Sequence, residues 1–324
     1  MARVLTGIQS SGRPHLGNLL GAIAPAIQLT REHDSESFIF IADLHSLTTI
    51  KDAETRKQNI LAVAAAWLAF GLDISKSVFY RQSRIPEVTE LTWYLSCYTP
   101  FPMLANAHSF KDKSDRLADV NGGLFIYPVL MAADILMYEA DMVPVGKDQL
   151  QHLEMTRDIA SSFNHKVGEE IFTLPEPLIS EAVQIVPGTD GQKMSKSYNN
   201  YIDIFLPEKQ LKKNINNIVT DSLPLEAVKN PDSCNVFQLF RLVAEERDTA
   251  ALKEKYLAGN FGYGHAKAEL LGVILSKYQE ERRMFDHYMN HPEEIEAKLS
   301  EGEAKAKEVA TAMLNRVREK LGFL

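Results

Sequence analysis

The chain has 324 residues, 45% of them hydrophobic and 24% charged, with a formal net charge of −8. This length suggests about two domains with a full core, and the acidic balance excludes nucleic-acid binding driven by overall charge. Two distant cysteines, Cys97 and Cys234, exclude a disulfide framework and all-cysteine metal sites. Every apolar run is shorter than the roughly 20 residues that are needed to span a membrane, and no signal peptide is recognised. We therefore expect a cytoplasmic protein without membrane contacts.

The first two-thirds of the chain alternates strand and helix patterns. Apolar runs over residues 4–6, 38–42 and 78–80 predict strands, because runs that are apolar on both faces suit a buried parallel sheet. Helical patterns over 18–31 and 53–70 separate these runs. This order predicts a parallel sheet with right-handed crossovers.

A largely helical stretch, about residues 86–140, then interrupts the alternation, and we interpret it as an insertion between the halves of the sheet. A strand pattern returns over 142–146 and a helix pattern over 148–163. Strand signals largely disappear beyond about residue 203. Helices are expected there over 209–219, 236–244, 266–289 and 292–321. The sequence therefore predicts an α/β domain over residues 1–205 and an all-α domain over 206–324.

The loop after the first strand is the first candidate site, TGIQSSGRPHLGN over residues 6–18. Ligands of open parallel sheets bind at the carboxyl ends of strands, and a helix N-terminus there suits phosphate. Gly12 and Gly17 permit close approach of the backbone, and His15 can donate a hydrogen bond to a phosphate. The spacing is neither GxGxxG nor a Walker A loop, so we expect another type of nucleotide site.

The second candidate site is GQKMSKS, residues 191–197. Lys193 and Lys196, three residues apart and flanked by small hydroxyl residues, make a cationic loop. Such a loop can stabilise the charge that builds on a polyphosphate leaving group. A pair of lysines alone would indicate an ordinary surface loop, so the interpretation depends on the first site.

Together, HLGN (residues 15–18) and KMSKS (193–197) resemble the two signature motifs of class I aminoacyl-tRNA synthetases. Asn18 at the end of the first motif is usual in the tryptophanyl and tyrosyl subclass. The resemblance implies a Rossmann-like catalytic domain with a helical insertion, followed by an all-α domain that reads the anticodon of tRNA. It also implies that the insertion forms the interface of a homodimer.

The middle of the chain is similar to the tryptophanyl branch of this class. YPVLMAADIL (127–136) resembles its substrate-recognition helix, and VPVGKDQLQHLE (143–154) resembles its ribose and amino-acid loop. Further matches are DLH (43–45), FKDKS (110–114), VTDS (219–222) and YGHAK (263–267). The resemblance runs from about residue 4 to the C-terminus and implies a tryptophan–tRNA ligase.

The chemistry of indole favours the same substrate. Indole offers one N–H donor and no acceptor, and Asp134 can supply the buried acceptor that a pocket needs. Met131, on the same helical face, is a polarizable partner for an aromatic ring, whereas the tyrosyl relatives typically carry glutamine there. Pairing a buried acceptor with the substrate N–H discriminates by about 10⁴–10⁵ against ligands that lack it. No editing domain is therefore needed, and none is visible.

The resemblance implies a two-step reaction in which tryptophan attacks the α-phosphate of MgATP and the acyl group then passes to the 3′ end of tRNA(Trp). We expect catalytic roles for His15, Lys193 and Lys196, and no metal site built by the protein. Expected ATP-binding residues are Gln9, Ser10, Ser11, Gly17, Asn18, Gly146, Lys147, Asp148, Ile185, Lys193, Met194, Ser195, Lys196 and Ser197. Expected tryptophan-binding residues are Thr6, His45, Tyr127, Met131, Asp134 and Gln149. Lys111 and Lys113 either assist at the phosphates or are surface lysines.

Three alternatives stay open at this level: a tyrosyl-type synthetase, a small-molecule nucleotidyltransferase and a non-catalytic paralogue. Met131 argues against the first, the helical C-terminal region against the second, and the intact 193–197 loop against the third. The chain also departs from the family pattern at Leu5, Thr6 and Ser10 and over residues 185–190. None of these departures removes a group that the chemistry requires.

Overall fold

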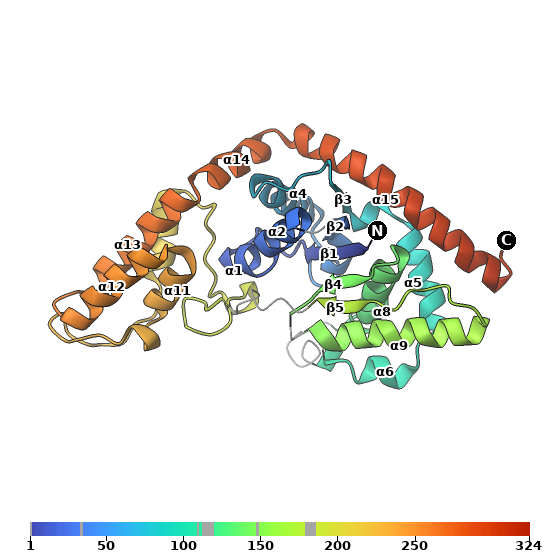
Figure 1. The fold of residues 1–324 in the computed structure, drawn as a ribbon, viewed down its shortest axis with the longest axis horizontal. Helices are drawn as coiled ribbons and strands as arrows, with labels where there is room; N and C mark the ends of the chain where they lie inside the picture. The colour runs from blue at the N-terminus through green and yellow to red at the C-terminus, as the bar shows by residue number, and fades with distance from the viewer. Residues whose placement is uncertain (1, 33–34, 109, 112–119, 147–148, 179–185) are drawn as a thin grey trace.

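A five-stranded, parallel sheet forms the centre of the computed structural model, which describes residues 2–32, 35–108, 110–111, 120–146, 149–178 and 186–324 (Figure 1). The strand order is β3-β2-β1-β4-β5. The strands are β1 (Arg3–Gln9), β2 (Glu36–Ala42), β3 (Ser77–Arg81), β4 (Met142–Pro144) and β5 (Glu176–Leu178). The predicted α/β class with a parallel sheet is confirmed.

Helices cover both faces of this sheet and make up the region beyond residue 206. They are α1 (Leu16–Asn18), α2 (Ala24–Glu32), α3 (Asp43–Ser46), α4 (Ala53–Ala69), α5 (Glu87–Tyr98), α6 (Phe101–Ala105), α8 (Gly122–Met137), α9 (Leu150–Val167), α10 (Glu208–Asn216), α11 (Asn235–Val243), α12 (Glu246–Ala258), α13 (Tyr263–Lys277), α14 (Gln279–Asn290) and α15 (Pro292–Leu321). A π-helical turn over Leu19–Ile23 continues α1 into α2. Within the described ranges, no helix has the length and apolar character required to cross a membrane.

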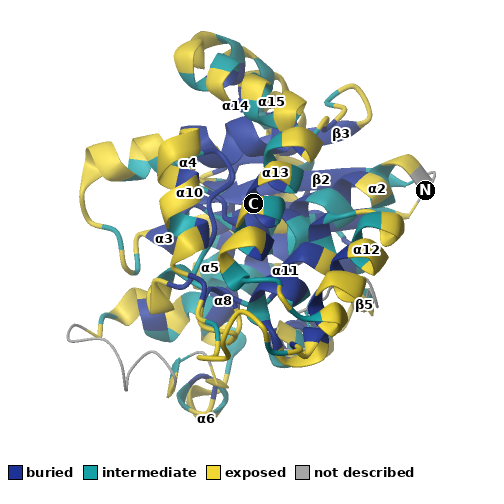
Figure 2. Ribbon diagram, turned by 90° about the vertical axis from the view of Figure 1, so that its left-hand side faces the viewer, coloured by how far each residue is buried: buried dark blue, intermediate teal, exposed yellow. Residues whose placement is uncertain are grey.

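The central strands are apolar on both faces because each face has its own core. Phe38 and Phe40 of β2 pack with α5, α8 and α9 on one side, and Ile39 and Ile41 pack with α4 and the C-terminal helices on the other. Figure 2 shows this buried interior beneath helices whose outer surfaces are exposed. The continuous apolar run that predicted this strand therefore reflects burial on two sides.

Two features differ from the sequence-based prediction. Residues 266–289, expected as one helix, form the separate helices α13 and α14, divided at Tyr278. The Tyr278 side chain is buried, and its ring lies 5.9 Å from that of Phe70 at the end of α4. The break lets α14 turn onto α4, which a continuous helix would not do. The short strand β5 and the helix α12 were not predicted, because neither has a clear apolar periodicity.

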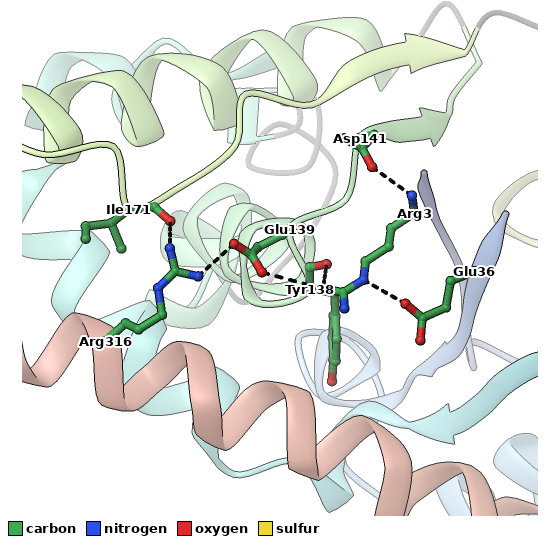
Figure 3. Close-up of polar contacts among 7 residues, drawn as sticks. All are labelled: Arg3, Glu36, Tyr138, Glu139, Asp141, Ile171 and Arg316. Carbon is green, nitrogen blue, oxygen red and sulfur yellow. Dashed lines mark hydrogen bonds and ion pairs between the residues drawn. The ribbon is translucent and has the colours of Figure 1, made fainter. Parts of the chain in front are cut away.

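The last helix, α15, returns from the helical region to the sheet (Figure 1). It crosses β3, where Arg81 pairs with Glu296 at 2.8 Å and with Glu303 at 2.5 Å. Near its end, Arg316 pairs with Glu139 at 2.7 Å and donates to the carbonyl of Ile171 at 3.1 Å (Figure 3). Residues near the C-terminus therefore stabilise the catalytic sheet. The domain division at residues 205/206 stays a prediction.

Hydrogen bonds also link the amino-terminal ends of the central strands around the start of β1 (Figure 3). The Arg3 guanidinium donates to Glu36 at 2.8 Å and to the carbonyl of Tyr138 at 3.1 Å. Its backbone N–H donates to Asp141 at 2.7 Å. These bonds link β1 to β2 and to the loop before β4, and so help to fix the central strand between its neighbours.

Gly302 should be essential for the crossing of α15 over β3. A Cβ atom at this position would lie 1.9 Å from the carbonyl oxygen of Phe79, which is backbone and cannot move aside. We expect Gly302→Ala to lower the free energy of unfolding by about 1–3 kcal/mol or more through overpacking. The measurement is the midpoint of denaturant unfolding.

The matched control is Gly272→Ala in α13, where a Cβ meets nothing within 4 Å. Alanine should stabilise this exposed helical position by about 0.5–1 kcal/mol. Equal effects at the two glycines would contradict the close crossing at Gly302.

Candidate active site

The carboxyl ends of β1, β2, β3 and β4 lie along one edge of the sheet, as parallel pairing requires. Along the chain, the strands progress outward from β1 through β2 to β3, and then resume on the other side of β1 with β4. The order therefore reverses between β1 and β4, and open α/β sheets bind ligands outside such a reversal. Of the candidate residues that the structure describes, His15 lies in the segment after β1 and His45 in the segment after β2, while Asp134 comes from α8.

Asp134 of α8 is a deeply buried acid at this edge, with 3% of its surface exposed. One carboxylate oxygen lies 2.9 Å from Nε2 of His45, which follows β2. The amide nitrogen of Gln82, which follows β3, lies 2.9 and 2.8 Å from the two oxygens. Burial raises the pKa of Asp134, and the hydrogen bonds from His45 and Gln82 oppose that rise.

Gln82, which contacts the candidate residue Asp134, was not predicted from the sequence. Its side-chain oxygen accepts a hydrogen bond from the backbone N–H of Leu44 at 3.1 Å, which fixes the amide nitrogen toward Asp134. The next residue, Ser83, donates its N–H at 2.8 Å and its hydroxyl to the buried Asp43. The available signal was a pair of polar residues directly after a buried strand.

Tyr127 and Met131 lie on the same face of α8 as Asp134, seven and three residues before it. The Tyr127 ring stands edge-on to His45, with centroids 4.5 Å apart. Burial, and to a lesser extent the charge on Asp134, raises the pKa of this tyrosine to about 12, so its hydroxyl stays neutral. Met131 is half-buried. The structure therefore brings together four of the six residues expected to bind tryptophan, including His45.

The other two lie elsewhere on this edge. Thr6 points to the face of β1 opposite that of Leu5, since side chains alternate along a strand. Leu5 belongs to the core that contains α8, so Leu5 and not Thr6 faces the Asp134 side. Gln149 is exposed and precedes α9, where its backbone N–H donates to Gly146 at 2.9 Å.

His15 caps the N-terminus of α1 and is buried. Its Nδ1 accepts from the backbone N–H of Asn18 at 3.3 Å, and the Asn18 side chain accepts from the His15 N–H at 3.2 Å. Burial, with a smaller effect of the Lys196 charge, lowers the pKa of His15 to about 4. The ring is therefore neutral at pH 7, and the cap places its proton on Nε2, which is free to act as a donor.

The two motif loops contact each other. The Gly17 N–H lies 3.3 Å from the sulfur of Met194, and a Cβ at Gly12 would lie 3.2 Å from Nζ of Lys196. Burial lowers the pKa of Lys196 to about 8, and the nearby carboxylate of Asp203 opposes this shift. Segments about 180 residues apart in sequence thus form one cationic cradle.

Asn200 holds the second loop in shape. Its side-chain amide donates to Asp190 at 2.7 Å and to the carbonyl of Lys193 at 3.1 Å, and its oxygen accepts from the Ser195 N–H at 2.7 Å. The Ser195 hydroxyl accepts from the N–H of Ser197 at 3.2 Å. These bonds leave the Lys193 side chain on the exposed surface of the loop.

The remaining predicted residues do not form one group. Gln9 is half-buried at the end of β1 and Ser11 is exposed, but Ser10 is fully buried with its hydroxyl 3.3 Å from that of Ser46. Lys111 donates to the side chain of Asn106 at 3.0 Å. Lys113, Lys147, Asp148 and Ile185 lie outside the described residues.

Comparison with known proteins shows the family of this chain. The model described as tRNA synthetases class I (W and Y) matches residues 1–278. A tryptophan–tRNA ligase of Fusobacterium nucleatum is 50% identical, with 100% of this chain and 99% of the relative covered. A tryptophanyl-tRNA synthetase from Campylobacter jejuni, crystallised with ADP and tryptophan, has a TM-score of 0.93 at 46% identity, with 99% of both chains covered. The chain therefore belongs to the class I tRNA synthetases of the tryptophan and tyrosine type, and within them to the family of tryptophan–tRNA ligases.

Proposed function

We propose that the chain activates L-tryptophan with ATP and transfers it to tRNA(Trp), with Asp134 as the group that selects the amino acid. The observation that carries this proposal is a buried carboxylate held by His45 and Gln82 at the carboxyl edge of the sheet. The related Campylobacter jejuni synthetase was crystallised with tryptophan and a nucleotide, ADP. Because that relative holds both ligands, it supports the proposal that this chain also has an amino-acid site and a nucleotide site.

The carboxylate of Asp134 has capacity for the indole N–H. An ionised carboxylate offers about four lone-pair sites, and His45 and Gln82 together make three contacts with it. One acceptor site is therefore left for one donor, which is what indole has. Met131 offers a thioether to the aromatic face and no hydrogen bond of the strength that a phenol oxygen would need, so tyrosine is the poorer fit.

Activation needs no base from the protein, because the tryptophan carboxylate is already ionised at neutral pH. One of its oxygens forms a bond to the α-phosphorus of ATP as the bond to the bridging oxygen breaks and pyrophosphate leaves. The neutral His15 can donate from Nε2 to a phosphate oxygen, and Lys193 and Lys196 can stabilise the departing charge. Mg²⁺ enters as part of the substrate MgATP.

In the second step, a ribose hydroxyl at the 3′ end of tRNA(Trp) attacks the acyl carbon of the adenylate and AMP leaves. We assign recognition of the anticodon to the helical region over residues 206–324. A cytoplasmic location fits a partner that is a tRNA.

We also propose a homodimer that pairs through the insertion. Three large apolar side chains are exposed on its helices: Trp93 on α5 (68% exposed), Phe101 on α6 (71%) and Ile126 on α8 (38%). The ring of Phe101 lies 5.4 Å from that of Phe125, next to Ile126. α5 and α6 both pack against α8, and large exposed apolar groups on neighbouring helices are a feature of interfaces.

Asp134→Asn should weaken tryptophan recognition. The substitution keeps the size of the side chain but removes the charge, and a hydrogen bond to a charged acceptor contributes about 1.5–3 kcal/mol. We expect KM for tryptophan in ATP–pyrophosphate exchange to rise by about 10- to 100-fold, while KM for ATP changes little. Asp158→Asn, at an exposed acid of α9, is the control. Exchange supported by tyrosine and not by tryptophan in the unaltered protein would refute the proposed substrate.

The titration of Lys196 should determine how kcat/KM for ATP falls at alkaline pH. Its lowered pKa of about 8 means that the free enzyme loses this charge above pH 8. A group with this pKa is only about one-tenth charged at pH 9, so kcat/KM for ATP should fall about tenfold between pH 7 and pH 9. Lys196→Arg should flatten this limb because guanidinium stays charged. The same limb in Lys196→Arg and in the control Lys209→Arg would show that another group titrates.

Phe101→Glu or Trp93→Glu should shift the protein from dimer to monomer, because a carboxylate cannot be buried unpaired in an interface. Light scattering coupled to size-exclusion chromatography measures the mass. Leu257→Glu, at an exposed apolar position of α12, is the control. A monomeric mass for the unaltered protein, or a dimer that survives both insertion variants, would argue against this interface.

A further inference from the structure

The corner between α14 and α15 carries three side chains with metal-binding groups. His287 lies in the last turn of α14, His291 directly follows that helix, and Glu294 lies in the first turn of α15. One nitrogen of each histidine and one carboxylate oxygen all lie within 4.8 Å of one another. His291 lies just outside the helix, but its ring stands 4.4 Å from that of His287, between centroids, so the two imidazoles lie on the same side of the corner.

The hydrogen bonds of the cluster already suit ligation. Nδ1 of His291 lies 2.8 Å from the carbonyl oxygen of His287, an acceptor, so this nitrogen carries the ring proton. Nε2 of His291 therefore keeps its lone pair on an exposed ring. Metal-binding histidines commonly have this arrangement, in which the second ring nitrogen donates to a backbone carbonyl and fixes the tautomer.

His287 and Glu294 form the other half of the cluster. Nε2 of His287 lies 3.0 Å from the Glu294 carboxylate. Ligand atoms around a tetrahedral zinc ion lie about 3.3 Å apart, given bonds of about 2.0–2.1 Å, so the metal fits between this pair with a small opening. The ring proton of His287 then moves from Nε2 to Nδ1. The two imidazole rings are nearly parallel, with centroids 4.4 Å apart, and one nitrogen of each ring lies within 4.8 Å of the other two ligand atoms.

The local charge favours a cation. Between Met284 and Ala297 the sequence carries four acidic side chains and neither lysine nor arginine. One of the four, Glu296, pairs with Arg81 of β3. Two imidazoles with one carboxylate select a borderline transition metal over Mg²⁺ or Ca²⁺, which prefer oxygen ligands. The three residues also lie beyond residues 1–278, the part of the chain that the family model matches.

We propose that His287, His291 and Glu294 bind one divalent transition metal ion of the zinc class, with water completing the tetrahedron. The ion would join the last turn of α14, which covers α4, to the first turn of α15, which crosses β3. It would thereby fix the corner at which the helical region turns back to the catalytic sheet. No metal site built by the protein was expected from the sequence. The break between residues 289 and 292 was predicted, but the close approach of the three side chains across it depends on how α14 and α15 pack.

Calorimetry tests this proposal without reference to the proposed reaction. Untagged protein stripped with EDTA is titrated with ZnCl₂, in a Cys97→Ser background because Cys97 is an exposed thiol that could also bind zinc. We expect one zinc ion per chain, and about 10-fold or more weaker binding in both His287→Ala and His291→Ala. His165→Ala, at an exposed histidine near the end of α9, is the matched control and should bind zinc as the background protein does. MgCl₂ should give no binding at this site.

A second measurement separates metal binding from folding. The melting temperatures of the stripped variants should lie close to that of the stripped background protein. Zinc should raise the melting temperature of the background protein and of His165→Ala by more than that of His287→Ala or His291→Ala. Glu294→Gln, which keeps the size of the side chain, should show an intermediate loss of affinity. Equal zinc affinity in His287→Ala, His291→Ala and His165→Ala, or binding only at millimolar zinc, would overturn the proposal.

Discussion

The pairing of β1 with β2 on one side and β4 on the other is the constraint on which the rest of the molecule depends. Because all five strands are parallel, their carboxyl ends share one edge. The pairing of the strands is therefore enough to bring the loops that follow them close together. The reversal of strand order beside β1 leaves space outside these loops. The helices secure this arrangement, and α15 crosses the sheet so closely that Gly302 has no room for a side chain.

Within that frame, the burial of Asp134 sets the chemistry. A buried carboxylate without partners would cost several kcal/mol or would be protonated. Its partners come from the ends of two different strands, His45 after β2 and Gln82 after β3. The position of the acceptor therefore depends on the relative register of the strands. The part of the site that we assign to the nucleotide is built differently. Two loops distant in sequence meet there, and burial holds His15 neutral and weakens the proton affinity of Lys196.

Much of the fold and part of the site could be predicted from local pattern. The strands β1 to β4, the long helices α4 and α15, and the two motif loops all have strong periodicity or distinctive composition. The break at Tyr278 could not be predicted, because the helical pattern continues across it and only the packing of α14 on α4 demands a turn. Gln82 was missed for a similar reason. A glutamine after a strand has no recognisable role in the sequence, because its partner Asp134 lies on α8, 52 residues further along the chain. The face of Thr6 was unknown until the strand was placed between its neighbours.

The sequence by itself determined the class of fold, the family resemblance and the chemical groups available, because these depend on residue type and on spacing along the chain. The tertiary structure decided which of those groups meet. It joined Asp134 to His45 and Gln82, set Lys196 over Gly12, and placed two histidines beside Glu294 at the corner of α14 and α15. Burial and distance arise only when segments far apart in sequence pack together, and they control both the proton affinities and the hydrogen bonds of the site.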